Sequence, residues 1–152
     1  MAPKDTRDPL TGMLLGLRLD GVEYGRCVMH EPWAIAFPPQ REASFHFIAQ
    51  GNCWMRTPST DWMHLNPGDA LFLPRSTFHV LASSPEVPAI DIDALARTVV
   101  SENLYLVNNE KSASPSAGDD ETAAHILFCG VMRFNLDPLH PLLAMMPDVM
   151  RA

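Results

Sequence analysis

The 152-residue chain lacks the features that mark membrane and secreted proteins. No apolar run approaches the roughly 20 residues that a membrane-spanning helix needs. Residues 1–8 are polar and carry both charge signs, unlike the basic start and apolar stretch of a signal peptide. We therefore predict a cytoplasmic protein without a membrane partner.

Basic residues are few and scattered along the chain. There are 11 Lys and Arg against 18 Asp and Glu, which gives a formal net charge of −7. A surface that contacts nucleic acid needs clustered Lys and Arg to neutralise phosphates. We therefore expect this segment to make no direct contact with nucleic acid.

Cysteine is also scarce, with Cys27, Cys53 and Cys129 far apart in the sequence. An odd number of widely spaced cysteines argues against a disulfide framework, and no Cys-x-x-Cys pair suggests a zinc knuckle. We expect reduced, buried thiols that pack as small apolar side chains.

From residue 21 to residue 82, short apolar runs alternate with turn residues. No helix separates the runs, and parallel neighbours need crossovers of a dozen or more residues. The sequence therefore predicts a mainly β protein, an antiparallel sandwich or barrel. Gln50-Gly51-Asn52 is expected to join two strands of one hairpin. The seven predicted strands are Val22–Met29, Trp33–Phe37, Ser44–Ala49, Cys53–Arg56, Trp62–Leu65, Ala70–Leu73 and Phe78–Ala82.

The flanking segments complete a single predicted domain over residues 1–152. A short helix is expected over 8–20, because Asp8 suits the N-cap, Pro9 the first helical position, and apolar residues follow at helical spacing. Residues 83–122 are interpreted as a mobile insertion, with a weak helical pattern over Ile92–Val100 and a short strand at Leu104–Val107. Residues 123–135 predict the final strand, and residues 137–151 predict short helical segments.

The segment Gly68 to His79 resembles the second cupin motif, which reads Gly, five residues, Pro, one residue, Gly, two residues, His. Gly68, Pro74 and His79 match, and Ser76 stands where the motif has its second glycine. The resemblance implies a double-stranded β-barrel of the jelly-roll type, with His79 pointing into the barrel.

The first cupin motif should end at Gly51, and in metal-binding cupins it supplies two histidines and a glutamate. Here Ser44 holds the glutamate position, and the histidine positions fall near Pro38 and Gln40. His46 lies two residues after Ser44 and so shares its face of the strand. A catalytic metal usually needs three protein ligands and an open position. We therefore predict no cofactor; the alternative is a divalent metal at His46 and His79, with Cys53 or Cys129 as a third ligand.

A wider pattern is similar to the N-terminal domain of AraC-type transcription regulators. It consists of Asp8-Pro9-Leu10, Pro32-Trp33, Phe45-His46-Phe47, Gly51-Asn52-Cys53-Trp54, the segment Gly68 to His79, Cys129-Gly130, His140-Pro141-Leu142-Leu143 and Met146-Pro147. The resemblance implies that the barrel binds a small organic effector and forms a homodimer. In that family a second domain with two helix-turn-helix units binds DNA, and we expect that domain to be absent here.

On this hypothesis His46 and His79 contact the effector, while Trp33, Trp54 and Phe72 line the cavity. Core filling is the alternative for Trp33 and Trp54, because aromatic side chains dominate core burial. The Leu and Met residues near the C-terminus suit either a dimer face or packing across the barrel. No Ser-His-Asp or Cys-His set is evident, so we predict that the chain is not an enzyme. A metal-dependent cupin enzyme and a stand-alone dimerisation module remain the alternatives.

Overall fold

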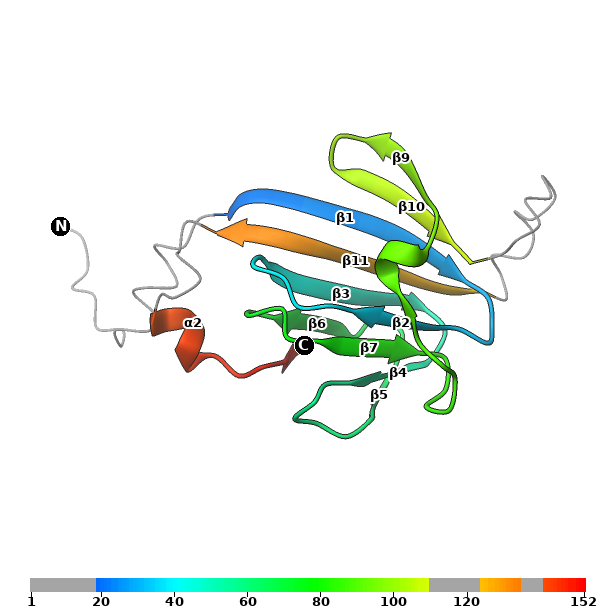
Figure 1. Cartoon of the computed structure of the whole chain (residues 1–152), viewed down its shortest axis with the longest axis horizontal. Helices are drawn as coiled ribbons and strands as arrows, with labels where there is room; N and C mark the ends of the chain where they lie inside the picture. Colours follow the sequence, from blue (N-terminus) through cyan, green and yellow to red (C-terminus); the bar gives the residue numbers. More distant parts are fainter. Residues whose placement is uncertain (1–18, 110–123, 135–140) are drawn as a thin grey trace.

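The computed structural model describes residues 19–109, 124–134 and 141–152, and these residues are mainly β (Figure 1). The first sheet has seven strands in the order β12-β6-β3-β11-β1-β10-β9. In chain order these are β1 (Leu19–Met29), β3 (Ala43–Gln50), β6 (Ala70–Leu73), β9 (Arg97–Ser101), β10 (Leu104–Asn108), β11 (His125–Phe134) and β12 (Met150–Arg151).

The second sheet has five strands in the order β5-β4-β7-β2-β8. They are β2 (Ala34–Phe37), β4 (Cys53–Arg56), β5 (Met63–Leu65), β7 (His79–Ala82) and β8 (Ile90–Asp91). The two helical elements of the described residues are the 3-10 turn η1 (Ile92–Ala94) and the helix α2 (Pro141–Met145). Neither is long and apolar enough to cross a membrane.

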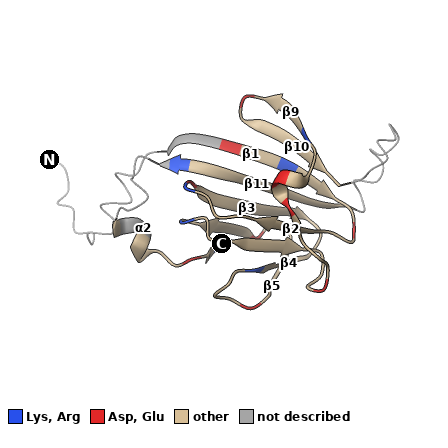
Figure 2. Cartoon of the chain, viewed as in Figure 1, with Lys and Arg blue, Asp and Glu red and all other residues tan. Residues whose placement is uncertain are grey.

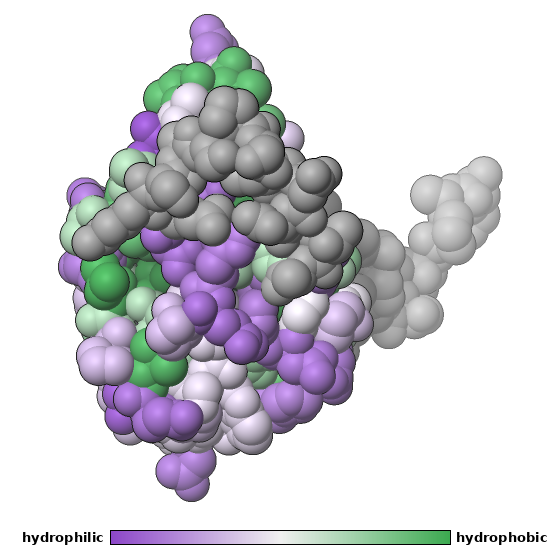
Figure 3. Space-filling model, turned by 90° about the vertical axis from the view of Figure 1, so that its right-hand side faces the viewer, coloured by the Kyte–Doolittle hydropathy of each residue, from purple (hydrophilic) through white to green (hydrophobic). Residues whose placement is uncertain are grey.

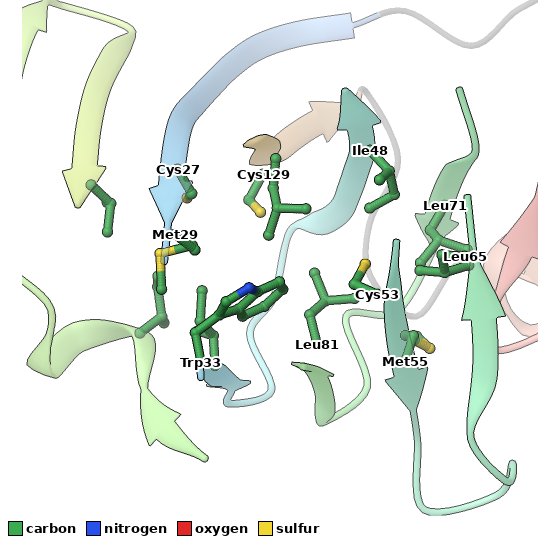
Figure 4. Close-up of a cluster of buried hydrophobic side chains, with 14 of the residues drawn as sticks. Cys27, Met29, Trp33, Ile48, Cys53, Met55, Leu65, Leu71, Leu81 and Cys129 are labelled. Carbon is green, nitrogen blue, oxygen red and sulfur yellow. The ribbon is translucent and has the colours of Figure 1, made fainter. Parts of the chain in front are cut away.

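The two sheets face one another (Figure 1), and the main apolar core is built from residues of both (Figure 4). Side chains alternate between the two faces of each strand, so every second residue enters the core. On β3, Ser44, His46 and Ile48 are buried, whereas Phe45 and Phe47 point to the other face. The second sheet contributes residues such as Ile35, Met55 and Leu81. All three cysteines are free and buried in this core, as the sequence predicts.

The predicted hairpin at Gly51 is wrong, because the chain changes sheets there. Strand β3 pairs with β6 and β11 in the first sheet, whereas β4 pairs with β5 and β7 in the second. Gly51 has a φ of 82° and packs so closely on the His125 ring that a Cβ would lie 2.9 Å from it. The turn therefore needs glycine, and it links the layers instead of closing one ladder.

Residues 83–109 contain more strand than the sequence suggests. The predicted helix over Ile92–Val100 is wrong beyond the single turn η1, because Arg97–Ser101 forms strand β9. The predicted strand at Leu104–Val107 is confirmed as β10. Not every pair is antiparallel as expected, because β10 pairs in parallel with β1 and β8 in parallel with β2. Each of these pairs joins strands distant in sequence, so the crossover requirement is met.

The chain ends differ from the expectation in detail. Most of the predicted helix over 8–20 lies outside the described residues, but Leu19 and Asp20 already belong to β1, with a bulge before Gly21. Of the short helical segments predicted over 137–151, the described residues contain the single helix α2, whereas Met150–Arg151 pairs with β6 as strand β12 and contradicts the prediction there. The first sheet ends at the β9–β10 hairpin, where Val99, Val100 and Leu106 are exposed. The hairpin lies at the top of Figure 1, and Figure 3 shows apolar surface at the top of the molecule.

Candidate functional site

Two imidazoles meet in the core between the sheets. His46 on β3 and His79 on β7 are both buried, and their Nε2 atoms lie 2.7 Å apart. Phe37 on β2 holds the pair on one side, because its ring stacks on His79 with an interplanar angle of 7° and tilts against His46. The pair therefore spans both sheets and fixes their separation at this point.

The hydrogen bonds define the tautomers of the pair. His79 Nδ1 lies 2.7 Å from the Thr77 carbonyl, which can only accept, so this nitrogen carries a proton. In a neutral His79 the Nε2 atom is then the acceptor, and His46 Nε2–H donates to it. His46 Nδ1 is left as a buried acceptor without a hydrogen-bond partner. A buried polar atom in this state is costly, and Trp33 Nε1 and His125 Nδ1 are in the same state.

Both histidines are neutral near pH 7. Burial lowers the pKa of His46 well below its usual value, and a charge on His79 would lower it further. Burial lowers the pKa of His79 to about 4, partly opposed by its hydrogen bond to the Thr77 carbonyl. The pair therefore offers neutral nitrogen atoms and not a positive charge.

A chain of hydroxyl groups lies beside the histidines. Gln40 Nε2 donates to Ser44 Oγ at 3.0 Å, and Ser44 Oγ lies 2.6 Å from Ser76 Oγ. Ser76 Oγ donates to the Glu42 carbonyl. Because that carbonyl can only accept, the Ser44 hydroxyl is the donor to Ser76.

A cavity of about 260 Å³ opens next to this group. Its buried side is formed by His46, and its open side carries Arg97 and Asp93, whose side chains are 38% and 74% exposed. The volume suits a small organic molecule. The lining residues are Glu23, Phe37, Pro38, Pro39, Gln40, Ser44, His46, Ile92, Asp93, Arg97, Tyr105, Cys129, Gly130 and Val131.

Arg97 and Tyr105 form one fixed wall of the cavity. The Arg97 guanidinium lies over the Tyr105 ring, 4.8 Å from its centroid, and Arg97 Nη2 donates to Asp93 Oδ1 at 3.0 Å. The ring packs on Gly25 of β1, where a Cβ would lie 2.1 Å from it. Burial raises the pKa of Tyr105 to about 12, so its hydroxyl stays protonated.

Comparison with known proteins identifies the fold family. A family model described as cupin matches residues 8–152, which is nearly the whole chain. The chain belongs to the cupin family. No curated protein and no solved structure shows a significant match to it.

The metal set of metal-binding cupins does not fit the residues found here. Ser44, at the glutamate position, contributes a hydroxyl already engaged with Ser76 and Gln40. The two histidine Nε2 atoms are 2.7 Å apart, a hydrogen-bond distance, whereas two nitrogens bound to tetrahedral zinc would be about 3.3 Å apart. Within residues 19–109, 124–134 and 141–152, no group of three His, Cys, Asp or Glu could hold a metal ion.

The structure brings together only part of the predicted site. His46 and His79 meet, but Trp54 lies on the outer face of the second sheet, 4.8 Å from the His64 ring. Phe72 points away from the core, opposite Phe45 on the neighbouring strand. The expectation that these two side chains line the cavity with the histidines is therefore wrong, because strand alternation turns both outward.

Trp33 is buried in the core but lines a different cavity of about 280 Å³, with Met29 and Leu95 among its neighbours. The sequence argument missed Arg97 and Tyr105, which lie in the segment interpreted as a mobile insertion. A signal was available, since Arg97-Thr98-Val99-Val100 and Leu104-Tyr105-Leu106-Val107 are rich in β-branched and aromatic residues. Figure 2 shows charged residues of both signs spread over the sheets of the described part, with no basic stripe.

Proposed function

We propose that this cupin domain binds a small organic effector in the cavity beside His46, and that it is the sensing domain of an AraC-type transcription regulator. DNA contacts would be made by a separate domain of the regulator. We further propose that the two sheets close as a jelly-roll barrel of the cupin type, which would place the effector between them.

One observation carries the proposal: the cavity is lined by charged, polar and apolar side chains together, and its buried side is a neutral histidine with an unpartnered Nδ1 atom. Such a mixture is usual for small-molecule sites. The order and spacing of motifs that resemble AraC-type regulators extend along the same residues that the cupin family match covers.

Effector binding is tested by thermal unfolding in the presence of a metabolite panel, because a ligand of the folded state raises the melting temperature by mass action. We expect at least one metabolite to stabilise the protein. The His46→Gln variant should lose this shift, whereas Trp54→Ala, on the outer face, should keep it. A well-folded protein that no metabolite stabilises would contradict the proposal.

The regulatory part is tested by measuring self-association with and without the effector. A sensor must bind the effector differently in two states, so the dimer dissociation constant should change when the effector is present. Sedimentation velocity over a concentration series provides this measurement. An effector that binds without changing the dimer dissociation constant, and without changing DNA binding by the full regulator, would exclude the sensing role.

A metal-dependent enzyme is the second candidate, in which the two buried imidazoles would have to exchange their mutual hydrogen bond for bonds to a metal. Elemental analysis of the purified protein distinguishes the two. Stoichiometric iron, manganese, nickel or zinc that is lost in His46→Gln and His79→Gln would support the enzyme and count against the sensor.

A further inference from the structure

We infer that the cavity beside His46 selects a small zwitterion, with an ammonium and a carboxylate group on one short molecule, as in a free amino acid. This inference rests on the proposed effector-binding function and names the class of the effector. It follows from the charged groups at the open side of the cavity, Glu23, Asp93 and Arg97.

Arg97 is a prepared receptor for a carboxylate. Its guanidinium is held by the ion pair with Asp93 at 3.0 Å and by the Tyr105 ring beneath it. A guanidinium has five N–H donors, and within the described part of the chain its one hydrogen-bond partner is Asp93. The remaining donors form a planar fork that matches a carboxylate, and a side chain already ordered loses little entropy on binding.

Glu23 supplies the opposite charge. It lies on the same face of β1 as Gly25 and Cys27, at the cavity wall, and among the described residues its carboxylate has no ion-pair partner. Asp93 and Arg97 already pair with each other, so Glu23 is the charged group of the described wall that still lacks an opposite charge. A ligand ammonium group would pair with Glu23.

Neither a simple anion nor a simple cation can pair with both Arg97 and Glu23. An anion would bind Arg97 but be repelled by Glu23, and a cation would pair with Glu23 but leave the free Arg97 donors unused. A zwitterion satisfies both groups. The remaining wall, with Phe37, Ile92, Val131 and the neutral His46, is uncharged and suits the rest of the molecule.

Isothermal titration with matched ligands tests the inference. The panel contains the free amino acids, the N-acetyl derivative of each, which keeps only the carboxylate charge, and the amide of each, which keeps only the ammonium charge. We expect at least one free amino acid to bind about tenfold more tightly than both of its derivatives. The derivatives change the ligand alone, so this comparison does not depend on the folding of a variant.

Two variants then assign the contacts. Glu23→Gln should weaken binding of the free amino acid about tenfold, and it should not weaken binding of the N-acetyl derivative, which Glu23 repels. Arg97→Gln should weaken binding of the free amino acid by a similar factor and should not weaken binding of the amide. Glu102→Gln and Arg56→Gln, which alter exposed charges that do not line the cavity, are the matched controls and should bind like the wild type.

The failures of the two proposals are distinguishable. If a derivative binds as tightly as its parent, or if other metabolites bind in a His46-dependent manner while no free amino acid does, the zwitterion inference is overturned and the effector site stands. If no molecule of either panel binds, both proposals are overturned. Equal effects of the cavity variants and their controls also overturn the inference.

Discussion

Ser44 and Ser76 share a hydrogen bond of 2.6 Å between their side-chain oxygens, although 32 residues separate them in the sequence. Both occupy positions where the cupin motifs have another residue, Ser44 in place of the glutamate and Ser76 in place of the second glycine. Ser76 has a positive φ of 45°, in the left-handed region that favours glycine. The hydroxyl at the motif's glutamate position is thus hydrogen-bonded to a hydroxyl at the motif's second glycine position.

Two substitutions of Ser76 should separate the contribution of its hydroxyl hydrogen bonds from the cost of its positive φ. Ser76→Ala keeps a Cβ at positive φ and removes the bonds to Ser44 and the Glu42 carbonyl, so we expect the free energy of unfolding to fall by about 1–3 kcal/mol. Ser76→Gly removes the same bonds but relieves the backbone, and should recover about 1 kcal/mol of that loss. Urea unfolding measures both. Equal destabilisation by alanine and glycine would show that the backbone at Ser76 is unstrained.

The histidine pair should make stability depend on pH. The pKa of His79 is about 4 in the folded protein against 6.5 for an exposed histidine, so between these values the unfolded chain binds more protons. Stability should therefore be full above about pH 6.5 and should fall by roughly 3 kcal/mol as the pH approaches 4. Urea unfolding at pH 7.5, 6 and 5 measures the slope. The slope should be shallower in His79→Gln, and an unchanged slope would contradict the assignment.

Gly25 and Tyr105 should show strong coupling. A Cβ at Gly25 would lie 2.1 Å from the Tyr105 ring, so Gly25→Ala must displace the ring and with it the support of Arg97. We expect a loss of about 1–3 kcal/mol in the wild type and almost none in a Tyr105→Ala background. A double-mutant cycle provides the test. Additive effects of the two substitutions would mean that the ring does not pack on this glycine.

The two tryptophans of the predicted site should differ in their effect on stability. Trp33 is buried in the core, so Trp33→Ala should cost about 3–5 kcal/mol. Trp54 lies half-buried on the outer face against His64, so Trp54→Ala should cost about 1 kcal/mol. Thermal or urea unfolding of the two variants ranks them. The reverse order would contradict the placement of Trp54.

Local patterns predicted most of the strands but not how the strands pair. The strands from Val22 to Ala82 could be identified because apolar runs and turn residues alternate there. The change of sheet at Gly51 could not, since a turn residue with positive φ suits a hairpin and a link between layers equally well.

The site was predictable where a motif fixed the residue and its face. His46 and His79 were found from the cupin motifs and from strand alternation relative to Ser44. The same alternation, applied to Trp54 between Cys53 and Met55, could not tell which set faces the core, because all three are apolar or aromatic. Arg97 and Tyr105 were missed because their place in the cavity depends on β10 joining β1, a pairing between segments distant in the chain.

Strand β1 is flanked by β10 on one side and β11 on the other, and both neighbours come from the last third of the sequence. Until residues 104–108 have been synthesised, β1 has no hydrogen-bonding neighbour on either edge, and its other edge waits for residues 125–134. The centre of the larger sheet therefore assembles only after synthesis has passed residue 134, and long-range pairing of this kind folds slowly. Until then the unpaired edge of β1 is open to pairing with strands of other chains.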